Sequence, residues 1–104
     1  IEFLVENNLP LVIMGLSDII IKHNLSQKQC NYLKENPAEA LKFKEGSAII
    51  GMPDWMIKIM FGKPDDINKT VTAYSTREQW VYKTGEIDRI YLYFDDGELK
   101  SWQE

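Results

Sequence analysis

The chain has 104 residues, a length that predicts one domain able to bury a single core without metals or disulfides. Its formal net charge of −4 and the lack of a basic stripe argue against nucleic acid and against an anionic membrane surface, because Lys and Arg carry most of the affinity for both. The single cysteine, Cys30, excludes an internal disulfide, and no apolar run reaches the ~18 residues of a membrane span. The chain begins at Ile1 rather than Met, as expected of a processed or truncated form.

The first part of the chain, residues 1–45, has the features of a helical extension. Pro10 suits the first turn of a helix over residues 10–23, in which apolar residues supply a face for burial. Ser26, with Gln29 three positions later, predicts a capping box at the start of a second helix.

Two more helices are predicted further along the chain. Asn36, directly ahead of Pro37, predicts the cap and the first position of a short helix that ends near Gly46. The segment 53–61 begins at Pro53, whose fixed φ favours a helix start. Its i, i+4 spacing predicts a core-facing stripe made of Met56, Ile57, Met60 and Phe61.

From Thr70 onward the hydrophobic period changes from 3.6 to 2, which predicts strands. The Asp96-Gly97 pair between two alternating segments predicts a type I′ hairpin with a two-residue turn. Such a turn places Asp95 opposite Glu98 and fixes the later pairs, so that Phe94 faces Leu99 and Tyr91 faces Trp102. The predicted strands cover residues 70–75, 78–83, 88–95 and 98–103.

This register divides the side chains of the predicted sheet between two faces. An aliphatic face, which should pack against helices, receives Ile90, Leu92, Phe94 and Leu99. The other face should be partly exposed, because a lysine shares it with the aromatic residues; it receives Tyr91, Tyr93, Lys100 and Trp102. Trp80 and Tyr82 share one face of a neighbouring strand, and Trp80 either joins the core or extends the exposed surface.

Together these elements predict an α+β fold, with N-terminal helices packed on one face of a three- or four-stranded antiparallel sheet. The chain is interpreted as a single domain over residues 1–104. Within it, residues 1–45 form the helical extension, and residues 46–104 form a helix followed by the sheet.

Three short patterns resemble the SmpA/OmlA (BamE-like) family of bacterial outer-membrane lipoproteins. They are Gly-Met-x-x-x-Met-Ile-x-x-x-x-Gly-x-Pro, Gln-Trp-x-Tyr and Phe-x-x-Gly-x-Leu, in this order. The resemblance implies a fold similar to that of β-lactamase inhibitor proteins and a non-enzymatic role in the cell envelope. The matching positions are Gly51, Met52, Met56, Ile57, Gly62, Pro64, Gln79, Trp80, Tyr82, Phe94, Gly97 and Leu99.

The sequence contains no pattern typical of catalysis, of a metal site or of a cofactor site. His23 is the only histidine and lies near a predicted helix end, where its charge would meet exposed carbonyls. The lone thiol of Cys30 is interpreted as a small buried apolar group rather than as a nucleophile. The pairs Asp65-Asp66 and Asp95-Asp96 suit either turns or a hard cation such as Ca²⁺, and their spacing favours turns.

The leading functional hypothesis is a non-enzymatic protein-interaction module, associated with the bacterial envelope, that uses an exposed aromatic sheet face. Tyr and Trp are enriched at binding hot spots because they bury a large area at a low entropic cost. A protein partner or a second copy of the chain should cover that face. The alternative hypothesis is a domain that binds a small molecule or peptide in a pocket between the apolar N-terminal segment and the sheet. The residues predicted to bind a partner are Trp80, Tyr82, Tyr91, Tyr93, Lys100 and Trp102.

Overall fold

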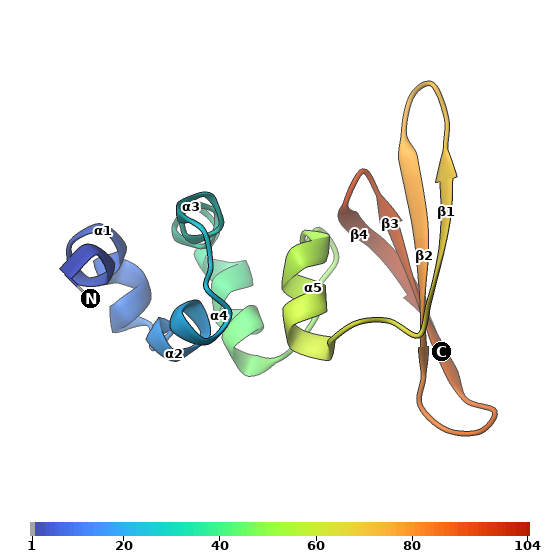
Figure 1. Cartoon of the computed structure of the whole chain (residues 1–104), viewed down its shortest axis with the longest axis horizontal. Coiled ribbons are helices and arrows are strands. Elements are labelled where there is room, and N and C mark those ends of the chain that lie inside the picture. The colour runs from blue at the N-terminus through green and yellow to red at the C-terminus, as the bar shows by residue number, and fades with distance from the viewer. Residues whose placement is uncertain (1) are drawn as a thin grey trace. The chain divides into compact units, whose positions relative to one another are not determined.

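A computed structural model describes residues 2–104 (Figure 1). The chain forms two compact units, of which the first ends at Ser47 and the second covers Ala48–Glu104. This division lies close to the predicted end of the helical extension at residue 45. Five helices followed by a four-stranded antiparallel sheet make up the described residues, so the α+β class is confirmed. None of these helices is long and apolar enough to cross a membrane.

The first unit is helical. Its core consists of buried apolar side chains, among them Leu33, Ala40 and Phe43, and Cys30 is one of these side chains with 2% exposure. Burial also raises the pKa of the Cys30 thiol, as expected of a thiol in apolar surroundings. The helices are α1 (Glu2–Ile13), α2 (Ser17–Lys22), α3 (Gln27–Glu35) and α4 (Pro37–Glu45).

The helix predicted over residues 10–23 is wrong, because α1 ends and α2 begins within that range. Gly15 has a φ of 82° and follows the last turn of α1. Its N–H donates to Val12 O, and the N–H of Leu16 donates to Leu11 O, which is the Schellman pattern of a helix C-terminus. Leu11 and Leu16 are both fully buried, so the break directs two leucines into one core.

Two other predicted boundary signals in this unit are confirmed, and the predicted side-chain cap at Asn36 is wrong. Ser26 and Gln29 form the predicted capping box, with Ser26 N–H to Gln29 Oε1 at 2.8 Å and Gln29 N–H to Ser26 Oγ at 3.1 Å. Pro37 is the first residue of α4, and the left-handed Gly46 (φ 79°) ends that helix as expected. The Asn36 side chain makes no cap; its amide instead donates to Tyr32 O at 2.8 Å.

The second unit contains α5 (Asp54–Phe61) and a meander of four strands. The strands are β1 (Asp66–Val71), β2 (Thr76–Lys83), β3 (Arg89–Asp95) and β4 (Glu98–Gln103), in the spatial order β1-β2-β3-β4. Strand β1 begins earlier than predicted, because Thr72 and Ser75 close a turn in which Thr72 N–H donates to Ser75 O at 2.9 Å. The other three strands lie where the alternating pattern predicts them.

The segment before α5 attaches this helix to the sheet. Gly51 N–H donates to Leu99 O, Leu99 N–H donates to Met52 O, and Asp54 N–H donates to Gly97 O. These bonds cover the outer edge of β4 at its start. Side chains of α5 then pack with one face of the sheet in a core that includes Met52, Met56, Ile57, Trp80, Leu92, Phe94 and Leu99.

The predicted core stripe of α5 is only half right. Met56 and Ile57 are fully buried, whereas Met60 is half-buried and Phe61 is 47% exposed. Phe61 is the last residue of the helix, and Gly62 follows with a positive φ of 82°. The helical spacing therefore identified the correct side of the helix but not the point along it where burial stops.

The predicted hairpin turn is confirmed, because Asp96 and Gly97 both have positive φ, 48° and 78°. Phe94 lies opposite Leu99 as predicted, but a β-bulge then shifts the register. Lys100 is the additional residue, and beyond it Leu92 pairs with Trp102. The predicted pairing of Tyr91 with Trp102 is therefore wrong; the partner of Tyr91 is Gln103.

Candidate binding hollow

The bulge decides on which face of the sheet each predicted binding residue lies. Residues paired directly across antiparallel strands share a face. The face that carries Leu92 and packs with α5, here called the inner face, therefore also carries Trp80, Tyr82 and Trp102. The opposite, outer face carries Tyr91 and Tyr93. The expected single patch of Tyr91, Tyr93, Lys100 and Trp102 is thus wrong, because the bulge at Lys100 moves Trp102 to the other side.

The shift has a clear physical reason. In a regular strand, Leu99 and Trp102 are three positions apart and would point to opposite faces. The additional residue, Lys100, brings both apolar side chains to the inner face. Lys100 itself remains exposed, with its Nζ 3.3 Å from Glu98 Oε1. The bulge thereby keeps the lysine in water and removes a tryptophan from the outer face.

Trp80 belongs to the core rather than to a surface. It is 5% exposed, and its ring lies 4.4 Å from that of Phe94 between centroids. Its indole Nε1 donates to Glu78 Oε1 at 3.2 Å, which satisfies the one polar atom of the side chain. Of the two roles left open by the sequence, the structure therefore supports the core role.

The outer face is held by a row of hydrogen bonds across all four strands. Asn68 Nδ2 donates to Gln79 Oε1 at 2.8 Å, and Gln79 Nε2 donates to the Tyr93 hydroxyl at 3.3 Å. The Tyr93 hydroxyl donates in turn to Gln103 Oε1 at 3.2 Å. Tyr93 and Tyr91 are both half-buried. Tyr93 is thus engaged with its own sheet, and this face offers less free aromatic surface than the sequence predicts.

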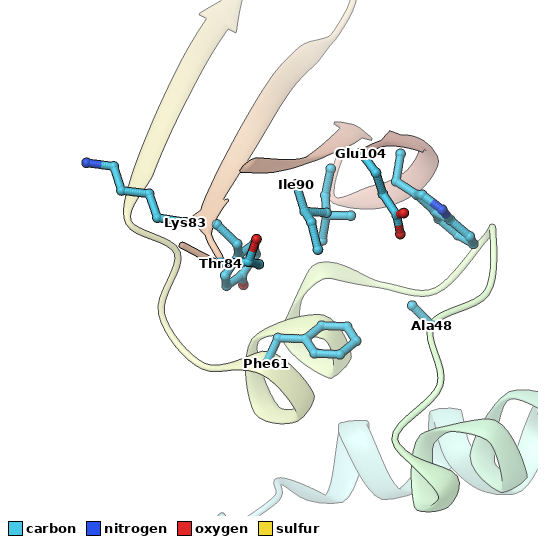
Figure 2. A pocket seen from close by; sticks show the side chains of 9 residues that line it. Ala48, Phe61, Lys83, Thr84, Ile90 and Glu104 are labelled. Atoms are coloured by element: carbon cyan, nitrogen blue, oxygen red, sulfur yellow. The ribbon is translucent and has the colours of Figure 1, made fainter. Parts of the chain in front are cut away.

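The inner face, in contrast, opens into an apolar hollow near the C-terminal ends of α5 and β4 (Figure 2). Its volume is about 410 Å³. The Phe61 ring extends from the helix in the direction of Ala48, and Ile90 projects from the sheet above it (Figure 2). The lining residues are Ala48, Phe61, Tyr82, Lys83, Thr84, Ile90, Leu92, Trp102 and Glu104.

Two walls of the hollow are half-exposed aromatic side chains. Phe61 is 47% exposed and Trp102 is 45% exposed, whereas Leu92 in the lining is 5% exposed. A buried aliphatic residue with aromatic residues around it is a common way to build a site for an apolar group. Sequence reasoning missed Phe61, Ile90 and Ala48 as site residues. It placed Phe61 and Ile90 on faces that pack in the core, and it assigned no role to Ala48.

Tyr82 fixes one wall of the hollow. Its hydroxyl donates to Gly62 O at 2.8 Å, and its ring meets Phe61 edge to face with centroids 6.4 Å apart. Burial, helped by the charge of Asp65, raises the pKa of Tyr82 to about 12. The phenol is protonated at neutral pH and donates its hydrogen bond to the end of α5. This bond holds the aromatic pair in place before any ligand arrives.

Polar side chains also belong to the lining of the hollow. Thr84 and Glu104 contribute to the lining, and the Lys83 side chain is directed away from the open space (Figure 2). Elsewhere, His23 lies exposed at the C-terminal end of α2, as expected. Among residues 2–104, no group of three or more His, Cys, Asp or Glu side chains is placed to hold a metal ion.

Comparisons with protein-family models, with curated proteins and with solved structures find no match for this chain. The resemblance to the SmpA/OmlA family and to the fold of β-lactamase inhibitor proteins therefore stays a prediction.

Proposed function

We propose that residues 48–104 form a non-enzymatic protein-interaction module, and that its binding site is the hollow on the inner face of the sheet. The observation that carries this proposal is the pair of half-exposed aromatic side chains, Phe61 and Trp102, beside a buried aliphatic floor. An aromatic pair gathered at one concave site is typical of a binding hot spot.

The occupant of the hollow would be an apolar side chain of the partner. Six of the nine lining residues are aromatic or aliphatic, and the other three are Lys83, Thr84 and Glu104. An apolar anchor surrounded by polar contacts is the usual arrangement of a protein interface. An aliphatic or aromatic side chain would gain about 1.5–3 kcal/mol from full burial there.

An association with the bacterial envelope is part of the same proposal. It is supported by the order and spacing of the three sequence patterns that resemble the SmpA/OmlA family. The resemblance implies two helices on one face of a small antiparallel sheet; residues 48–104 share the antiparallel sheet and have one helix, α5, beside it.

A small apolar molecule is the second candidate for the occupant. The volume of about 410 Å³ falls in the range of ligand sites in proteins, roughly 300–1,000 Å³. Phe61 and Trp102 remain 47% and 45% exposed, which favours a protein anchor, because small molecules are usually enclosed on most sides.

Two matched substitutions test the proposal. Trp102→Ser removes a wall of the hollow, and Tyr93→Ser removes an aromatic ring from the outer face. When the chain is immobilised and exposed to extract of its native cells, wild type and Tyr93→Ser should retain the same protein. We expect Trp102→Ser to retain at least ~10-fold less, as for a hot-spot residue.

The hollow would be refuted as the binding site if wild type and both variants retained the protein equally, or if only Tyr93→Ser failed to retain it. Circular dichroism before the experiment serves as a control, since a variant that is unfolded gives no information about the surface. A small molecule found in the wild-type chain by native mass spectrometry, together with no retained protein, would favour the second candidate.

A further inference from the structure

The two edges of the sheet differ in how they are covered. The edge of β4 is paired at its start with residues 51–54, through hydrogen bonds that involve Gly97 and Leu99. All six residues of β1, Asp66–Val71, are exposed. No backbone group of the described chain pairs with the outer side of β1. An open strand edge is a template for a further strand, and proteins usually cover or blunt it.

The hydrogen-bond pattern shows which residues of β1 face outward. Thr72 N–H donates to Ser75 O, and paired residues alternate along an antiparallel ladder. Asn68 and Thr70 therefore bond to β2, while the backbone groups of Ile67, Lys69 and Val71 point away from the sheet. The Ile67 N–H accordingly bonds to the Asp66 side chain, at 3.0 Å from Oδ1. The N–H groups of Lys69 and Val71 have no such local acceptor among the described residues.

The side chains of the same three residues form a distinct pattern on the inner face. Ile67 is 45% exposed and Val71 is 67% exposed, and Lys69 lies between them. Glu78 is opposite Lys69 on β2 and accepts a hydrogen bond from Trp80 through Oε1, but no ion pair joins Glu78 to Lys69. Lys69 makes no ion pair with any described residue.

We propose that the outer edge of β1 binds an extended segment of another protein as a fifth strand. That segment would carry an acidic residue between two apolar ones on a single face. Backbone hydrogen bonds to Lys69 and Val71 would provide affinity, and the alternating side chains would provide specificity. The acidic residue would lie opposite Lys69, and the apolar residues would cover Ile67 and Val71.

The charge of Lys69 decides between this occupant and a second copy of the chain. If two copies paired antiparallel through β1, the register that sets Ile67 against Val71 of the other copy would also set Lys69 against Lys69. Like charges directly opposite each other are unfavourable. A partner strand with an acidic residue has the same apolar contacts and an attractive charge pair instead. This inference is independent of the hollow, which lies around Phe61 and Trp102.

Two synthetic peptides test the proposal. In one peptide every second residue is threonine, and the residues between them are valine, glutamate and valine in that order. The other peptide has lysine in place of the glutamate. Both are titrated into the whole isotope-labelled chain, and amide chemical shifts are followed by NMR. We expect shifts along β1 and a preference of about three- to tenfold for the glutamate peptide, as for a reversed cross-strand charge pair.

Three variants make the test specific. Lys69→Glu should reverse the preference, Lys69→Gln should remove it, and Trp102→Ser should leave it unchanged. Absence of shifts along β1, or the same preference in all variants, would overturn the proposal. It would also be overturned if β1 shifts depended on protein concentration without peptide, because the occupant would then be a second copy.

Discussion

Replacing Phe94 with alanine should lower the free energy of unfolding by about 3–5 kcal/mol, the usual range for a buried phenylalanine. Phe94 is 2% exposed and packs directly against the Trp80 ring. Truncation would leave a cavity between β3 and α5 in which the small remaining side chain makes no aromatic contact. All three tryptophans lie within Ala48–Glu104, so tryptophan fluorescence during chemical denaturation reports on this unit alone.

Tyr93→Ala is the matched control for Phe94→Ala. The two residues are neighbours on β3, but Tyr93 lies on the outer face and is only half-buried. Its loss should cost about 1–2 kcal/mol, as for a partly exposed residue with hydrogen bonds. Equal losses for the two variants would show that the inner face is not the principal packed face of the sheet.

Replacing Ile57 with alanine should lower the free energy of unfolding by about 2–5 kcal/mol. Ile57 is fully buried on the side of α5 that faces the sheet. Alanine itself favours a helix, so the loss would reflect packing rather than helix propensity. Chemical denaturation, again followed by tryptophan fluorescence, measures this difference.

Phe61→Ala in the same helix provides the comparison. Phe61 is 47% exposed, and its main described ring contact is with Tyr82 at the hollow. The variant should lose about 1 kcal/mol or less, as for a surface position. A loss as large as that of Ile57→Ala would mean that Phe61 supports the fold, and it would remove one wall of the hollow from consideration as a free surface.

Local signals in the sequence predicted the fold well where one or two residues determine the backbone. The Asp96-Gly97 turn requires positive φ at both positions, and both residues adopt it. The capping box of Ser26 and Gln29 likewise depends on side chains three residues apart. Such features involve neighbours in the chain and therefore appear in the sequence directly.

Features set by tertiary packing were not predicted. The bulge at Lys100 arises because Leu99 and Trp102 both enter the inner face, a preference that strict alternation conceals. The sequence predicted one helix over residues 10–23, but α1 ends before Gly15, and Leu11 and Leu16 on either side of the break are both fully buried. In each case the burial of two apolar side chains outweighed the regular local pattern.

Only part of the candidate site was predicted, because the rest of it also depends on tertiary packing. Trp102 and Tyr82 were expected to contact a partner, and both line the hollow. Their companion Phe61 was assigned to the core, since spacing along a helix shows its buried side but not how far the sheet extends beneath it. The hollow exists because the sheet continues past the end of α5, and only the folded arrangement reveals this.

Photo-crosslinking in the native cell tests most directly whether the hollow binds a protein partner. Benzoylphenylalanine is introduced at Phe61, at the mouth of the hollow, and separately at Tyr91 on the outer face as a control. If the hollow binds a protein partner, irradiation should attach one discrete protein to the chain labelled at position 61, and little to the chain labelled at position 91. A crosslink to that protein from position 91 alone, or no discrete product from position 61, would contradict the assignment of the hollow as the binding site.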